Sequence, residues 1–117
     1  MFRAIASVSA LFAALTARAV ACNGMTSTLP VSVCTFGCTN SFGTQQRTID
    51  LGLTGASSVS WMQDQQYASL NVGNLSNFST LSVAIDPTTQ HILLTAATIN
   101  NVRTIVQIDV VLCYPSS

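Results

Sequence analysis

Four cysteines are the residues of this chain with the clearest capacity for chemistry: Cys22, Cys34, Cys38 and Cys113. Three residues separate Cys34 from Cys38, whereas thioredoxin-type redox sites have two and adjoin a helix, and no helical pattern follows here. A zinc site needs further ligands at convergent spacing, and the only histidine, His91, is distant in sequence. An even cysteine number in a short exported chain therefore predicts two disulfides. All three pairings stay open, and each ties Cys113 to the N-terminal part of the chain.

Acid–base catalysis has few candidate groups. His91 is the only imidazole and the chain has no glutamate, so a partner would have to be an aspartate or another non-histidine group. Two of the four aspartates are explained by a turn and a loop, which leaves Asp50 and Asp109 as candidate carboxylates for glycoside hydrolysis. A surface ion pair, such as Asp50 with Arg47, or a charge that protects a sheet edge is the commoner role. The chain also lacks the G-x-S-x-G elbow of many serine hydrolases. We predict a structural His91, no catalytic residue, no metal ligand and no cofactor.

A possible ligand-contact cluster consists of Trp61, Gln63, Asp64 and Tyr67, which are expected to gather at one hairpin tip. Aromatic rings beside carboxylate and amide groups are what a sugar-binding surface requires, because the rings stack on the sugar and the polar groups orient it. The alternative is that Trp61 belongs to the core, since it shares a strand face with other apolar residues.

Two N-glycosylation sequons follow one another directly, Asn74-Leu75-Ser76 and Asn77-Phe78-Ser79. In a chain this rich in serine and threonine, about two matches are expected by chance. Their position between strands nevertheless suits a glycan. We therefore name Asn74 and Asn77 as candidate sites, to be considered if the source is eukaryotic.

The first 21 residues resemble a secretory signal peptide. Arg3 precedes an apolar run over residues 4–15, and small residues precede a cleavage point after Ala21. That run is too short to cross a bilayer, which takes about 20 residues. A lipobox ending at Cys22 is an alternative, but lipidation would leave an odd cysteine. We expect a leader over 1–21 and a single secreted β-rich domain over 22–117. That domain has two arginines, four aspartates and no lysine, which excludes a basic nucleic-acid surface.

The elements that position these groups are predicted to be β-strands. Apolar residues recur with period two over residues 102–112. Asn100-Asn101 suits a two-residue hairpin turn, which would pair Ile99 with Val102 and His91 with Val110. Upstream, Asp86-Pro87 suits a type I turn that places Ile85 opposite His91. Together these turns predict a three-stranded meander over residues 78–112.

Further strands are predicted nearer the N-terminus. Residues 57–62 and 67–72 flank a four-residue loop and are expected to form a second hairpin, and 29–36 and 47–53 read as short strands. About seven short strands indicate an all-β fold, a small disulfide-stapled antiparallel β-sandwich or barrel. The back face of the meander, which includes Ile92, Leu94 and Ile105, is either covered or an exposed apolar patch.

These observations favour a small secreted β-domain that acts by extracellular binding to a protein or glycan partner, an effector- or toxin-like interaction module. Nothing in the sequence calls for nucleic acid or a membrane span, and the oligomeric state stays open. A structural or surface-coating secreted protein is the first alternative, prompted by low charge and high apolar content. A small secreted hydrolase is the second.

Overall fold

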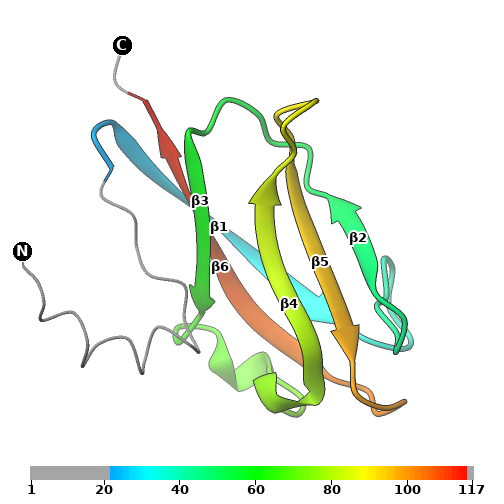
Figure 1. Ribbon diagram of the computed structural model, residues 1–117. Helices are drawn as coiled ribbons and strands as arrows, with labels where there is room; N and C mark the ends of the chain where they lie inside the picture. Colours follow the sequence, from blue (N-terminus) through cyan, green and yellow to red (C-terminus); the bar gives the residue numbers. More distant parts are fainter. Residues whose placement is uncertain (1–21, 116–117) are drawn as a thin grey trace, which may run out of the picture.

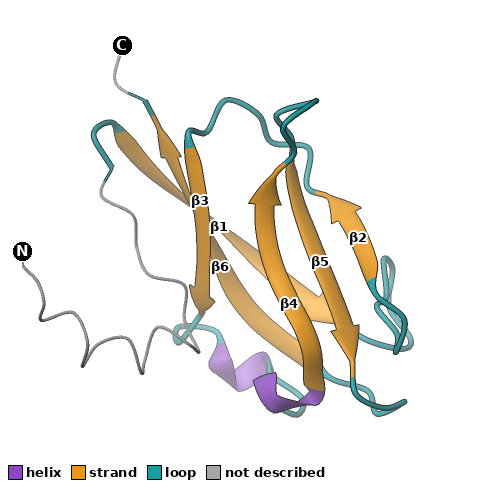
Figure 2. Ribbon diagram, viewed as in Figure 1, coloured by secondary structure: helices purple, strands orange, loops and turns teal. Residues whose placement is uncertain are grey.

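A computed structural model describes residues 22–115 of the chain, and the expected leader over 1–21 lies outside these described residues. The fold consists of strands and two short 3₁₀-helices (Figures 1 and 2). In chain order the elements are β1 (Met25–Cys34), β2 (Arg47–Asp50), β3 (Ser58–Gln63), η1 (Ala68–Leu70), η2 (Leu75–Asn77), β4 (Phe78–Ile85), β5 (Ile92–Thr98) and β6 (Ile105–Tyr114).

The strands form two antiparallel sheets of three, in the orders β1–β6–β3 and β2–β5–β4. One hydrophobic core joins their apolar faces, with Val106, Ile108, Val110 and Leu112 from β6 and Ile92, Leu94 and Ala96 from β5. Burying each larger aliphatic side chain stabilises the fold by about 1.5–3 kcal/mol. The all-β prediction is confirmed, with six strands in the described part of the chain instead of about seven.

Two disulfides involve strands of the β1–β6–β3 sheet. Cys22 is bonded to Cys113 near the end of β6, and Cys34 at the end of β1 is bonded to Cys38. The two disulfides expected from the even cysteine count are therefore present. Their pairing is one of the three that the sequence left open. β6 lies between β1 and β3, so the first bridge fastens the central strand to the start of the described chain.

The hairpin predicted at Asp86-Pro87 exists, but its register differs by one residue. Ile85 lies opposite Ile92, and the loop is closed by a hydrogen bond from the Asp86 N–H to the His91 carbonyl. Gln90 has a left-handed backbone, with φ 66°, which accommodates one residue more than predicted. Because side chains alternate between faces, this shift turns the even-numbered residues of β5 into the core. The prediction that Ile92 and Leu94 lie on the far side of the sheet is therefore wrong, and these side chains are not an exposed patch.

The predicted pairing between residues 91–99 and 102–110 is also wrong. β5 and β6 belong to different sheets, so His91 does not pair with Val110. Asn100-Asn101 does not form a two-residue hairpin turn: the segment between the strands runs from Ile99 to Thr104 and crosses from one sheet to the other. Only β4 and β5 of the predicted meander form a hairpin, and the third predicted strand, β6, belongs to the other sheet (Figure 1).

The chain after β3 leaves the sheet and then returns to it. The second half of the predicted hairpin is not a strand, since β3 pairs with β6 and residues 68–70 form η1. Val72 then exchanges two backbone hydrogen bonds with Ile105. Between these points, the Asn71 side-chain oxygen accepts the Gln107 N–H at 2.9 Å. The Asn71 side chain thus accepts the Gln107 N–H in place of a backbone carbonyl from a neighbouring strand. Residues 65–70 are not part of the sheet.

Candidate functional site

The four residues predicted to contact a ligand do not share one surface. Trp61 packs against the core, and Gln63 lies two residues on in the same strand. Asp64 is buried, with 4% of its surface exposed, and one carboxylate oxygen accepts the Tyr67 N–H at 3.1 Å. Tyr67 itself is 44% exposed. The carboxylate that would orient a sugar is therefore used to hold the loop, and Tyr67 alone of this group presents an open ring.

A polar group lies on the outer face of the β1–β6–β3 sheet. The four core residues of β6 alternate with Gln107 and Asp109, which consequently point away from the core. Ser32 donates a hydrogen bond to the Gln107 side-chain oxygen at 2.7 Å. Asp109 is paired in register with Pro30 on one side and Met62 on the other.

Asp109 also interacts with Asp64, an aspartate that sequence reasoning had assigned to a loop. Burial, followed by the hydrogen bond and the charge of Asp64, raises the pKa of Asp109. The neighbouring Asp64 carboxyl therefore disfavours the charged form of Asp109. Glycoside hydrolysis instead needs carboxyl groups about 5 Å or more apart on either side of the scissile bond. The contact therefore favours a structural role for this pair.

Asp50 and His91 form a second polar pair, on the β2–β5–β4 sheet. The His91 Nδ1 lies 2.6 Å from an Asp50 carboxylate oxygen, and both side chains are substantially exposed. The His91 hydrogen bond, and then the hydrogen bond donated by the Gly52 N–H, lower the pKa of Asp50. The expected Asp50–Arg47 ion pair is not formed, because Arg47 donates to the Ser41 carbonyl at 2.6 Å. Within residues 22–115, no hydroxyl or thiol is hydrogen-bonded to the other imidazole nitrogen, so this dyad lacks a nucleophile.

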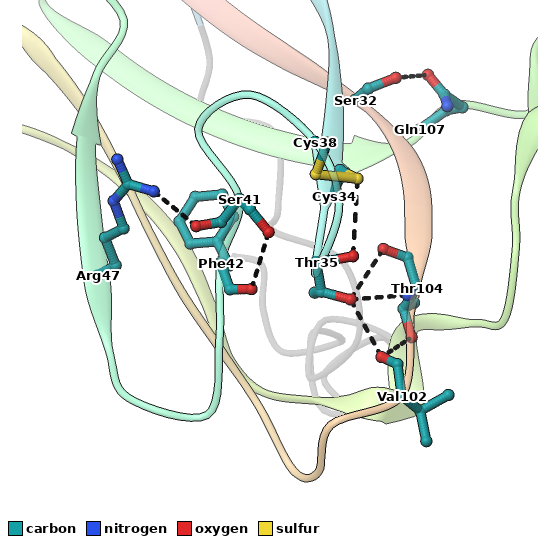
Figure 3. Close-up of a disulfide and its surroundings, with 10 residues drawn as sticks. All are labelled: Ser32, Cys34, Thr35, Cys38, Ser41, Phe42, Arg47, Val102, Thr104 and Gln107. Carbon is teal, nitrogen blue, oxygen red and sulfur yellow. Dashed lines mark hydrogen bonds between the residues drawn. A yellow bond between two sulfur atoms is a disulfide. The ribbon is translucent and has the colours of Figure 1, made fainter.

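The Cys34–Cys38 disulfide adjoins a buried threonine network (Figure 3). Thr35 is fully buried, and its hydroxyl oxygen accepts the Thr104 N–H at 2.7 Å. The same hydroxyl donates to the Val102 carbonyl at 3.1 Å. These bonds fix the connection between β5 and β6 against the end of β1. Sequence reasoning missed both threonines, because only the tertiary contact distinguishes them from the many others in the chain.

Exposed apolar side chains are concentrated at one end of the molecule. Of the seven large ones in the described chain, six lie in two segments, residues 62–72 and 99–102: Met62, Tyr67, Leu70, Val72, Ile99 and Val102. We call these six residues the apolar end. Val72 is hydrogen-bonded to Ile105 at the start of β6, and Ile99 is hydrogen-bonded to Asn77 at the end of η2, so each segment is fixed to a neighbouring element. Both lie at the lower end of the molecule in Figure 2, around the 3₁₀-helices and the β5–β6 connection.

Two hollows in the surface of the described residues differ in size and in enclosure. A pocket of about 80 Å³ beside the Cys22–Cys113 disulfide is well below the roughly 300–1,000 Å³ of typical ligand sites. A hollow of about 470 Å³ along residues 43–47 and Phe36 lies within that range but is broadly open to solvent. Residues 22–115 contain no cluster of three or more histidine, cysteine, aspartate or glutamate side chains suited to a metal ion.

The described residues also contain no helix of the length and apolar character that crossing a bilayer requires. Comparison with protein-family models, with curated proteins and with solved structures found no match.

Proposed function

We propose that this chain is a small secreted β-domain whose two sheets pack as a sandwich and which acts by binding an extracellular protein. The observation that carries the proposal is the apolar end. A small protein that exposes Leu70, Val72, Ile99 and Val102 on two segments at the same end of the molecule keeps apolar surface in water, and such surface, surrounded by polar residues, is typical of contact sites. Export is supported by the two disulfides, which persist in oxidising compartments.

A protein partner fits this surface better than a glycan does. Sugar recognition relies on exposed aromatic rings and free polar groups, and here Trp61 is packed on the core while Asp64 is bonded to the backbone of its own loop. Aliphatic side chains such as Leu70 match the apolar centre of a protein interface. Catalysis is disfavoured because the Asp64–Asp109 pair is in contact and the Asp50–His91 dyad has no nucleophile beside it.

The test compares binding by three forms of the chain. L70E combined with V102E places two charges within the apolar end, whereas M25E places one on a residue that is 70% exposed at the far end of β1. Each form is immobilised and exposed to extracellular fluid from the source, and the captured proteins are identified. A specific partner should bind the wild type and M25E alike and should bind the double variant at least about tenfold more weakly, equivalent to 1.4 kcal/mol.

Other outcomes identify the competing functions. Equal binding by the double variant would contradict the assignment of the contact surface. Binding to a glycan array that survives the double substitution would favour a sugar ligand. Concentration-dependent self-association of the wild type in sedimentation, abolished by L70E/V102E, would favour the surface-coating alternative.

A further inference from the structure

The two adjacent sequons have different surroundings in the folded chain. Asn74 is exposed and has an extended backbone at the N-terminus of η2. Its side-chain oxygen accepts hydrogen bonds from the Ser76 N–H, at 2.9 Å, and from the Ser76 hydroxyl. The hydroxyl that defines the sequon is thus in contact with the acceptor amide. Within the described residues, no hydrogen bond engages the Asn74 side-chain nitrogen, so this atom is available from solvent.

Asn77 uses the same nitrogen to hold the fold together. Its side-chain N–H donates to the Thr104 hydroxyl at 3.0 Å, and the residue is partly buried. A β-carbon on Gly73 would lie 2.8 Å from this nitrogen, which shows how closely the Gly73 backbone approaches it. The Asn77 carbonyl also accepts the Ile99 N–H, so the residue joins η2 to the β5–β6 connection. A sugar on this nitrogen would collide with Gly73 and Thr104.

We propose that Asn74 is the single N-glycosylation site of the folded protein and that Asn77 stays unmodified. The donor is a lipid-linked oligosaccharide diphosphate. The Asn74 side-chain nitrogen forms a bond to the anomeric carbon, the bond from that carbon to the diphosphate oxygen breaks, the lipid diphosphate leaves with the electron pair, and the nitrogen loses one proton. The inference rests on the proposed export, in a eukaryotic secretory pathway.

A matched pair of serine substitutions separates the two sites without altering either asparagine. S76A removes the hydroxyl from the first sequon, and S79A removes it from the second. The six strands and two disulfides described above lie within residues 22–115, so a foreign leader replaces residues 1–21 and the chain is secreted from a eukaryotic host. Intact mass before and after treatment with peptide N-glycosidase counts the glycans, and peptide mapping locates the asparagine that the enzyme converts to aspartate.

The wild type and S79A should each carry one glycan, on Asn74, and S76A should carry none. S76T keeps the sequon and should retain the glycan, which distinguishes loss of the acceptor from loss of the fold. A glycan on Asn77 in the wild type, two glycans, or an unmodified secreted wild type would overturn the proposal. The full chain with its own N-terminus is expressed in parallel. If that chain stays in the cell while the foreign-leader form is modified on Asn74, the proposed export is wrong and the site stands.

Discussion

Replacing Cys22 and Cys113 with alanine removes the disulfide that spans 91 residues, and replacing Cys34 and Cys38 removes one that spans 4. In the chain-entropy description, a disulfide reduces the entropy of the unfolded chain. The long bridge thereby raises the free energy of the unfolded state by about 4.6 kcal/mol and the short one by about 1.9 kcal/mol. Each variant loses one buried sulfur, from Cys113 or Cys34, so packing losses largely cancel in the comparison. We therefore expect C22A/C113A to be about 2.7 kcal/mol less stable than C34A/C38A.

Equilibrium unfolding in urea measures this difference. The only tryptophan, Trp61, is packed against the core, and its fluorescence reports unfolding in both variants. With the usual dependence of about 1–3 kcal/mol per molar urea, the two midpoints should differ by roughly 1–3 M. Complete unfolding of C22A/C113A in buffer beside a folded C34A/C38A would give the same ranking. Equal midpoints, or a lower midpoint for C34A/C38A, would refute the argument that loop length governs the stabilisation.

Three other substitutions test individual polar contacts. Burial and Asp64 raise the pKa of Asp109, so the folded state loses stability as the pH rises from the unfolded value near ~3.9 through the raised one. Asp109→Asn should therefore raise the urea midpoint at pH 7 and leave it nearly unchanged at pH 3; a lower midpoint at pH 7 would contradict this. Asp50 has a lowered pKa, so its contribution is present above about pH 4 and is lost as the pH falls through the lowered value. Asp50→Asn should lower the midpoint slightly at pH 6 and not at pH 2, and an equal effect at both values would contradict a stabilising role for the ionised Asp50 carboxylate. Thr35→Val leaves the buried Thr104 N–H without its acceptor and should cost about 1–3 kcal/mol in urea unfolding, whereas Thr35→Ser should recover most of it.

Strand content was predictable because alternation is a local property. The core residues of β6, from Val106 to Leu112, were found on one face by their period of two, and the Asp86-Pro87 turn correctly joined β4 to β5. The register of that hairpin was not predictable to one residue. It depends on the left-handed backbone of Gln90, and glutamine gives no signal for that conformation, unlike glycine or asparagine.

Which strands are hydrogen-bonded to one another was harder to predict than the register of one hairpin. Two strands that face each other across a core and two strands that are hydrogen-bonded in one sheet show the same alternation, so the pattern of β5 and β6 fits either arrangement. Only the backbone partners decide, and these depend on contacts remote in sequence, such as Thr35 with Thr104.

The two polar pairs, Asp64–Asp109 and Asp50–His91, could not be predicted because they depend on this strand pairing. Asp64 meets Asp109 because β3 pairs with β6, and Asp50 meets His91 because β2 pairs with β5. The residue types were recognised in the sequence, but their partners were not. The exposure of Tyr67 and Leu70 likewise depended on η1 replacing a predicted strand.

The loop between Asp64 and Asn71 leaves the β1–β6–β3 sheet and is attached to β6 at both ends. Asp64 and Val72 anchor its two ends to β6 through backbone hydrogen bonds, and the Asn71 amide completes the edge between them. Residues 65–70 could consequently be lengthened, shortened or exchanged as a cassette while the sheet keeps its alignment. A scaffold built this way can acquire a new target by grafting six residues, with no need to redesign its core.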